Sequence, residues 1–115
     1  MNAFVNVALN AIGGQSSGPT AISYGTKTSV SFSGSVIQTL ALSGNTTLAF
    51  SGVQPGNVVI LDITSSGAYT VSWPATAYFA GGTTPTMTSS GEDVYTILCL
   101  SASKFVVTAV QAIAT

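Results

Sequence analysis

The sequence predicts an all-β domain, an antiparallel β-sandwich of jelly-roll type with an N-terminal arm. Short runs rich in Val, Ile, Thr, Phe and Tyr, which suit a pleated and half-buried surface, recur along the chain. Turn signals separate these runs at the spacing of a sandwich or barrel. After Thr28, no stretch combines a helical hydrophobic period with helix caps.

Residues 1–28 are expected to form the arm and a first edge strand near Ala21–Tyr24. Residues 1–15 fit a strand by one pattern and a helix by another, so their conformation stays open. Gly13-Gly14 ends this run, and a small polar linker follows. The bulky apolar side chains of the arm argue against a frayed terminus. We expect these side chains to contact another protein surface: Phe4, Val5, Val7, Leu9 and Ile12.

Residues 29–115 are expected to form the sandwich itself. A β-turn is predicted at 54–57, because Pro55 sets φ at the second position and Gly56 accepts a positive φ at the third. Residues 75–92 are expected to be a longer loop with a short strand near Thr86–Thr88, and a hairpin turn is expected at 101–103. The expected strands are Ser29–Ser33, Val36–Leu42, Thr47–Phe50, Asn57–Thr64, Tyr69–Trp73, Val94–Leu100 and Phe105–Ala112.

The charge content argues against several classes of function. The chain has two lysines, three acidic residues and neither Arg nor His, so 4% of it is charged where about 25% is usual. Nucleic-acid binding needs several cations to displace counterions from phosphates, and none is expected here. No apolar run approaches the roughly 20 residues that span a bilayer, and no signal peptide is evident. We therefore expect a protein made in a cytoplasm, with no membrane partner.

The titratable residues do not predict an enzyme, a cofactor or a metal site. Without His, neither a Ser-His-Asp arrangement nor a His-based metal site can form, and the single Cys99 is expected in the core. The carboxylates are Asp62, Glu92 and Asp93. The last two are adjacent and would point to opposite faces of a strand, whereas Asp62 could meet Asp93 across strands. The simpler expectation is that Asp62 pairs with a lysine or lies at an interface.

Three aromatic residues, Trp73, Tyr78 and Phe79, cluster around Pro74 and the following loop. Aromatic side chains near a loop can anchor a protein interface or stack on a sugar. The alternative is that they close one end of the sandwich as a plug of the core. The sequence leaves these three interpretations open.

Several predicted strands are apolar on both faces. A strand with one solvated face should alternate apolar and polar residues. In Val58–Ile63, Val94–Leu100 and Phe105–Val110, both alternating sets are mostly apolar. One set can fill the core, and the other needs a second cover. Neighbouring subunits are the most economical cover for so small a domain, so we expect a homo-oligomer.

An ordered series of short motifs resembles a module of tailed-bacteriophage virion proteins, found in head decoration (cement) proteins and at the tips of tail fibres. The similarity covers roughly residues 38–100. A tryptophan that often closes the final hairpin in longer relatives is replaced here by Phe105. The motifs are Gly44-Asn45-Thr46-Thr47-Leu48-Ala49-Phe50, Val53-Gln54-Pro55-Gly56, Thr70-Val71-Ser72-Trp73-Pro74, Gly81-Gly82-Thr83-Thr84-Pro85-Thr86 and Asp93-Val94-Tyr95-Thr96.

This resemblance implies a virion structural protein with a β-sandwich fold, usually a homotrimer, and brings no catalytic residues. A tail fibre needs a shaft and a docking domain, whereas only about 28 residues precede the module, so decoration of the capsid surface is favoured. The expected partners are the chain itself and the major capsid protein, with the arm contacting a subunit or the capsid. The alternative is a receptor- or glycan-binding tip that uses Trp73, Tyr78 and the 75–92 loop.

Overall fold

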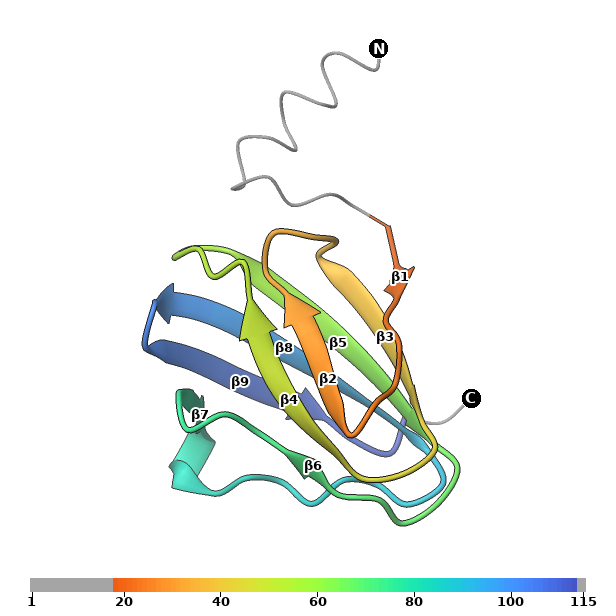
Figure 1. The fold of residues 1–115 in the computed structure, drawn as a ribbon. Helices are drawn as coiled ribbons and strands as arrows, with labels where there is room; N and C mark the ends of the chain where they lie inside the picture. Colours follow the sequence, from red (N-terminus) through yellow and green to blue (C-terminus); the bar gives the residue numbers. More distant parts are fainter. Residues whose placement is uncertain (1–17, 114–115) are drawn as a thin grey trace.

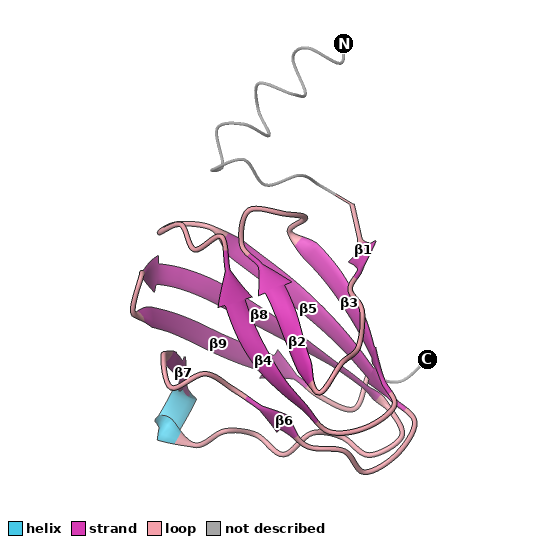
Figure 2. Ribbon diagram, viewed as in Figure 1, coloured by secondary structure: helices cyan, strands magenta, loops and turns pink. Residues whose placement is uncertain are grey.

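The computed structural model describes residues 18–113, which form nine strands in two sheets (Figure 1). A single 3-10 turn, Ala80–Gly82, is the one helical segment in this range (Figure 2). The larger sheet has the order β1 (Thr20–Ala21), β3 (Ile37–Leu42), β5 (Val58–Ser65), β8 (Glu92–Ser101), β9 (Lys104–Val110) and β7 (Ala77–Phe79). The smaller sheet has the order β2 (Lys27–Ser31), β4 (Thr46–Ser51) and β6 (Val71–Ser72). The prediction of an all-β chain is confirmed.

From β1 to β6 the chain passes from one sheet to the other after every strand. Each strand therefore lies parallel to the strand two before it: β1, β3 and β5 in the larger sheet, and β2, β4 and β6 in the smaller one. In this winding, Val30 is opposite Phe50 and Leu40 is opposite Ile63. Antiparallel pairing begins only where β8 joins β5 and continues from β8 to β9.

The predicted antiparallel pairing is therefore wrong for most of the domain, and the strand order is not that of a jelly roll. The physical reason is that alternation of apolar and polar residues tells which face a side chain takes but not which strand lies beside it. The predicted hairpin at 101–103 is confirmed, with Cys99 opposite Phe105 and a bulge after Cys99.

Two short elements differ from their predictions. The edge strand expected at Ala21–Tyr24 is β1, two residues at Thr20–Ala21. No strand forms at Thr86–Thr88; instead Ala77–Phe79 pairs with β9. Met87 is buried in the core, and the amide of Thr88 donates to Asp93 Oδ2 at 2.9 Å, so side chains and not a strand ladder hold this segment. The predicted contacts at Phe4, Val5, Val7, Leu9 and Ile12 lie outside the described residues.

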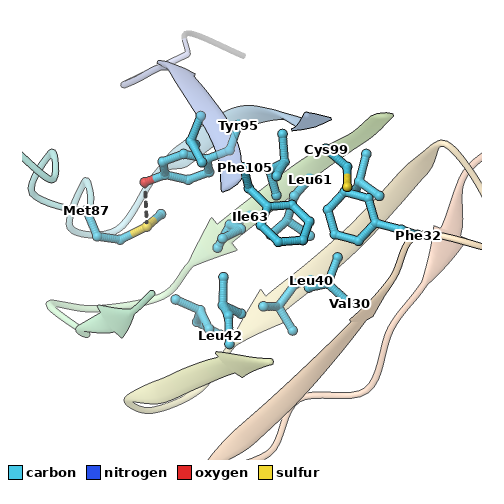
Figure 3. Packing of buried hydrophobic residues seen from close by; sticks show 14 residues of the cluster. Val30, Phe32, Leu40, Leu42, Leu61, Ile63, Met87, Tyr95, Cys99 and Phe105 are labelled. Carbon is cyan, nitrogen blue, oxygen red and sulfur yellow. Dashed lines mark hydrogen bonds between the residues drawn. The ribbon is translucent and has the colours of Figure 1, made fainter. Parts of the chain in front are cut away.

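The core fills the space between the two sheets (Figure 3). Phe32, which follows β2, contacts Phe105 of β9 with ring centroids 5.1 Å apart, and Phe50 contacts Phe105 at 4.7 Å. The larger sheet contributes one alternate set of side chains, among them Leu40, Leu61 and Ile97. Burying each such aliphatic side chain is worth about 1.5–3 kcal/mol, so this layer stabilises the contact between the sheets.

Polar side chains hold the crossings between the sheets. Asn57, buried at the start of β5, donates from Nδ2 to the carbonyl of Phe32 at 2.7 Å. Gln38 donates from Nε2 to the carbonyls of Ser31 and Ser35 at 2.7 and 2.8 Å. The predicted β-turn at 54–57 is present: the Asn57 amide donates to the Gln54 carbonyl, and Gly56 has φ +92°.

Candidate functional site

The outward faces of the two sheets differ in chemistry. On the smaller sheet, the side chains that point away from the core are almost all hydroxyl-bearing, with one lysine and one alanine. Such a face is well solvated and needs no cover. Its outward side chains are Lys27, Ser29, Ser31, Thr47, Ala49, Ser51 and Ser72.

The larger sheet presents an apolar surface on the side away from the core, which we call the outer face. Its members alternate along β3, β5, β8 and β9 with the buried core residues, so they point in the opposite direction. In Figure 1 the smaller sheet lies on one side of the larger sheet only. The large apolar members of the outer face are Ile37, Val58, Ile60, Val94, Leu98, Val106 and Val110. The same face carries Thr39, Ala41, Asp62, Thr64, Glu92, Thr96, Lys104 and Thr108.

Strand register places these apolar side chains in continuous rows. Val58, Leu98 and Val106 lie directly opposite one another on β5, β8 and β9. The adjacent row runs from Ile37 and Ile60 to Thr96 and Thr108. Side chains opposite one another have Cβ atoms about 4.5–5.5 Å apart, so the first row is a contiguous apolar strip and the second is apolar over half of its length.

The apolar side chains of this face are exposed at the ends of the strands and half-buried between them. Val110 is 64% exposed, and Leu100, which follows the same outward alternation, is 50% exposed. No strand or helix of residues 18–113 lies over the face. Apolar side chains gathered in this way on one open face are typical of a contact with another protein or a ligand. The sequence-based prediction that several strands are apolar on both faces therefore corresponds to a real surface.

One carboxyl pair lies on the outer face, and it is not the pair that the sequence suggested. Asp62 is opposite Val94, whereas Asp93 is opposite Ile63, so Asp62 and Asp93 point to opposite sides of the sheet. The carboxyl of Asp62 instead lies within hydrogen-bonding reach of Glu92. This contact comes first in raising the pKa of Glu92, followed by burial and by repulsion from Asp62. The expected pairing of Asp62 with a lysine is absent from residues 18–113.

Asp93 is fully buried and joins three segments at one end of the core. Its Oδ2 accepts hydrogen bonds from the Thr88 amide at 2.9 Å, the Tyr95 hydroxyl at 3.2 Å and Gln111 Nε2 at 3.2 Å. Its Oδ1 accepts from the Ala112 amide at 2.9 Å. Burial alone would raise the pKa of Asp93, but these hydrogen bonds outweigh burial and lower it. The carboxylate is a structural acceptor, saturated by its partners.

The structure separates the three aromatic residues that were predicted as a contact surface. Trp73 and Phe79 pack against the core, with ring centroids 5.2 Å apart, and Trp73 lies 5.0 Å from the ring of Tyr95. Tyr78 points the other way, is 51% exposed, and has Lys104 Nζ 5.4 Å from its ring centroid. Alternation along β7 explains the difference, because adjacent residues of a strand face opposite sides.

Beside Trp73, a cleft of about 230 Å³ opens between β6 and residues 84–87. Its walls combine rings with threonine hydroxyls, and Met87 forms its base together with Tyr95, whose hydroxyl donates to the Met87 sulfur at 3.3 Å (Figure 3). The edge-to-face packing of Trp73 ties this cleft to the core.

The remaining side chain that could be reactive, the Cys99 thiol, is buried in the core. Burial raises the pKa of the Cys99 thiol, which lowers its thiolate fraction and its reactivity. Within residues 18–113, no three His, Cys, Asp or Glu side chains gather in a way that could hold a metal ion. In the same range, no helix has the length and apolar character needed to cross a membrane.

Comparison of the chain with protein-family models, with curated proteins and with solved structures finds no match. The geometry of the outer face is therefore the main basis for a functional conclusion.

Proposed function

We propose that this chain is a structural subunit of a phage virion, a capsid decoration or cement protein that binds the head as an oligomer and stabilises the shell. The observation that carries the proposal is the outer face, a surface rich in apolar side chains that the described chain leaves open. Such a surface suits a protein whose working state is an assembly. The motif series resembling head decoration modules supplies the class of assembly.

Two further features support an assembly role. The net charge is −1, so copies repel one another only weakly, which favours association over colloidal separation. The hydroxyl-rich face of the smaller sheet offers a solvated exterior opposite the apolar one. In this proposal the chain self-associates, contacts the major capsid protein, and stabilises the shell by binding only the assembled lattice.

The number of copies in purified virions tests this function. Quantitative mass spectrometry against the major capsid protein should find hundreds of copies, because decoration sites repeat over the lattice. A handful of copies would contradict decoration and favour a tail-fibre tip, and complete absence from virions would contradict both.

A further inference from the structure

The outer face contains one feature that opposes its burial, the contact between the carboxyls of Asp62 and Glu92. Glu92 is opposite Thr64 and Asp62 is opposite Val94, so the two acids are diagonal neighbours on adjoining strands. Oδ1 of Asp62 is shielded from solvent and has no hydrogen-bond partner. A buried carboxyl oxygen without a partner can still accept a hydrogen bond from a donor brought close to it.

Among residues 18–113, no cation lies beside this pair to neutralise it. Lys104 is at the other end of β9 from Val110, six residues or about 20 Å along the strand, and its Nζ faces the ring of Tyr78. Lys27 lies on the outward face of the smaller sheet. The other titratable residues of β8 lie on the same strand as Glu92, but their side chains point into the core: Asp93, Tyr95 and Cys99. The chain termini lie outside the described residues.

A second copy of this chain fits the outer face in area. The strands of the larger sheet, at about 3.3 Å per residue and about 4.8 Å between strands, cover roughly 600 Å². Two such faces together bury about 1,200 Å², the lower end of the range for specific interfaces. The sheet edges are β1 and β7, only two and three residues long, so a partner gains little by adding a strand there.

We propose that a second copy of this chain covers the outer face, and that it does so when the Asp62–Glu92 pair shares a proton. The inference rests on the proposed function, since it assigns the apolar face to self-association. A protonated carboxyl donates to its neighbour, so the pair enters the interface with one negative charge fewer.

The direction of the pH dependence follows from linkage. Glu92 has a pKa raised above its ordinary value of 4.5 in the free chain, and removing water from the pair raises it further in the assembly. The assembled state then binds more protons than the free chain. Association strengthens as pH falls through this raised range, by up to about tenfold in the association constant per pH unit and subunit. At higher pH the association is lost.

Sedimentation equilibrium of the full chain between about pH 5 and about pH 8, at constant ionic strength, tests this inference. The wild-type protein should associate more tightly at the acidic end. Glu92→Gln, which keeps the shape and removes the titration, should associate at about pH 8 within about twofold of the acidic wild type, with its pH slope lost. Lys104→Gln, a charge change elsewhere on the outer face, should keep the wild-type slope.

Asp62→Asn serves as a second variant of the pair if Glu92→Gln does not fold, and circular dichroism checks both. An unchanged pH slope in these variants, or a wild-type association constant that does not vary with pH, would overturn the proton switch but leave the assembly role standing. A folded wild-type chain that stays monomeric over the whole range would overturn the self-association itself. The copy number in virions tests the decoration function separately.

Discussion

Asp93 shows at the residue scale how the fold uses one of its few charges. The carboxylate joins the segment at Thr88, strand β8 and the chain after β9 through four hydrogen bonds. Each of its two oxygens accepts from a backbone amide, which a neutral amide side chain cannot reproduce on both sides. The sequence identified Asp93 as one of three carboxylates, but two of its partners, Gln111 and Ala112, lie far away along the chain and could not be predicted.

We expect Asp93→Asn to lower the free energy of unfolding at neutral pH by about 1–3 kcal/mol, because one backbone amide loses its acceptor. Since the pKa of Asp93 is lowered in the fold, its contribution is present above its ordinary value of 3.8 and is lost as pH falls through the folded-state value. Urea unfolding at about pH 7 and about pH 3 measures this. The gap between variant and wild type should shrink at acid pH, and an equal gap at both would contradict the assignment. Glu92 is present in both the variant and the wild type, so its contribution cancels in the difference between their free energies of unfolding.

At the scale of elements, alternation predicted the strands better than their partners. Asn57–Thr64 was predicted almost to its ends because β-branched residues follow a Pro-Gly turn, and the structure has β5 at Val58–Ser65. The pairing of Val30 with Phe50 could not be predicted, since it depends on the chain crossing between sheets. Ala77–Phe79 was missed because three residues carry too little pattern, and only its pairing with β9 makes it a strand.

Asn57 gives a test of these crossings. Its amide nitrogen donates to the Phe32 carbonyl and so ties the start of the crossing from β2 to β3 to the start of β5. Asn57→Asp keeps the shape but turns a carboxylate oxygen toward that buried carbonyl. We expect the free energy of unfolding to fall by about 2–3 kcal/mol near neutral pH, measured by chemical denaturation. Gln54→Glu, in the exposed part of the adjacent turn, is the matched control and should change the stability by less than about 0.5 kcal/mol. If both substitutions lower the free energy of unfolding equally, the hydrogen bond from Asn57 to the Phe32 carbonyl does not stabilise the fold as proposed.

For the whole molecule, the sequence indicated an apolar second face but not where its acids lie on it. Val58, Ile60, Val94 and Leu98 were recognisable as a second apolar set, because both alternating sets of their strands are apolar. That Asp62 and Glu92 lie beside each other on this face depends on the pairing and register of β5 and β8, which alternation does not encode. The predicted contact role of Trp73 and Phe79 stays a prediction, and their packing against the core favours the aromatic plug.

If the outer face is an association surface, a lysine placed on one of its two middle strands should prevent assembly. Leu98 of β8 lies between Val58 and Val106, so Leu98→Lys puts a charge into the interface without entering the core. Ser29→Lys adds the same charge to the outward face of the smaller sheet as a control. The measurement is sedimentation velocity of both variants and the wild type at micromolar concentration and about pH 5, where association should be strongest.

We expect an oligomer for the wild type and for Ser29→Lys, and a folded monomer with a near wild-type melting temperature for Leu98→Lys. A Leu98→Lys protein that sediments as the same oligomer as the wild type would contradict an association surface on the outer face.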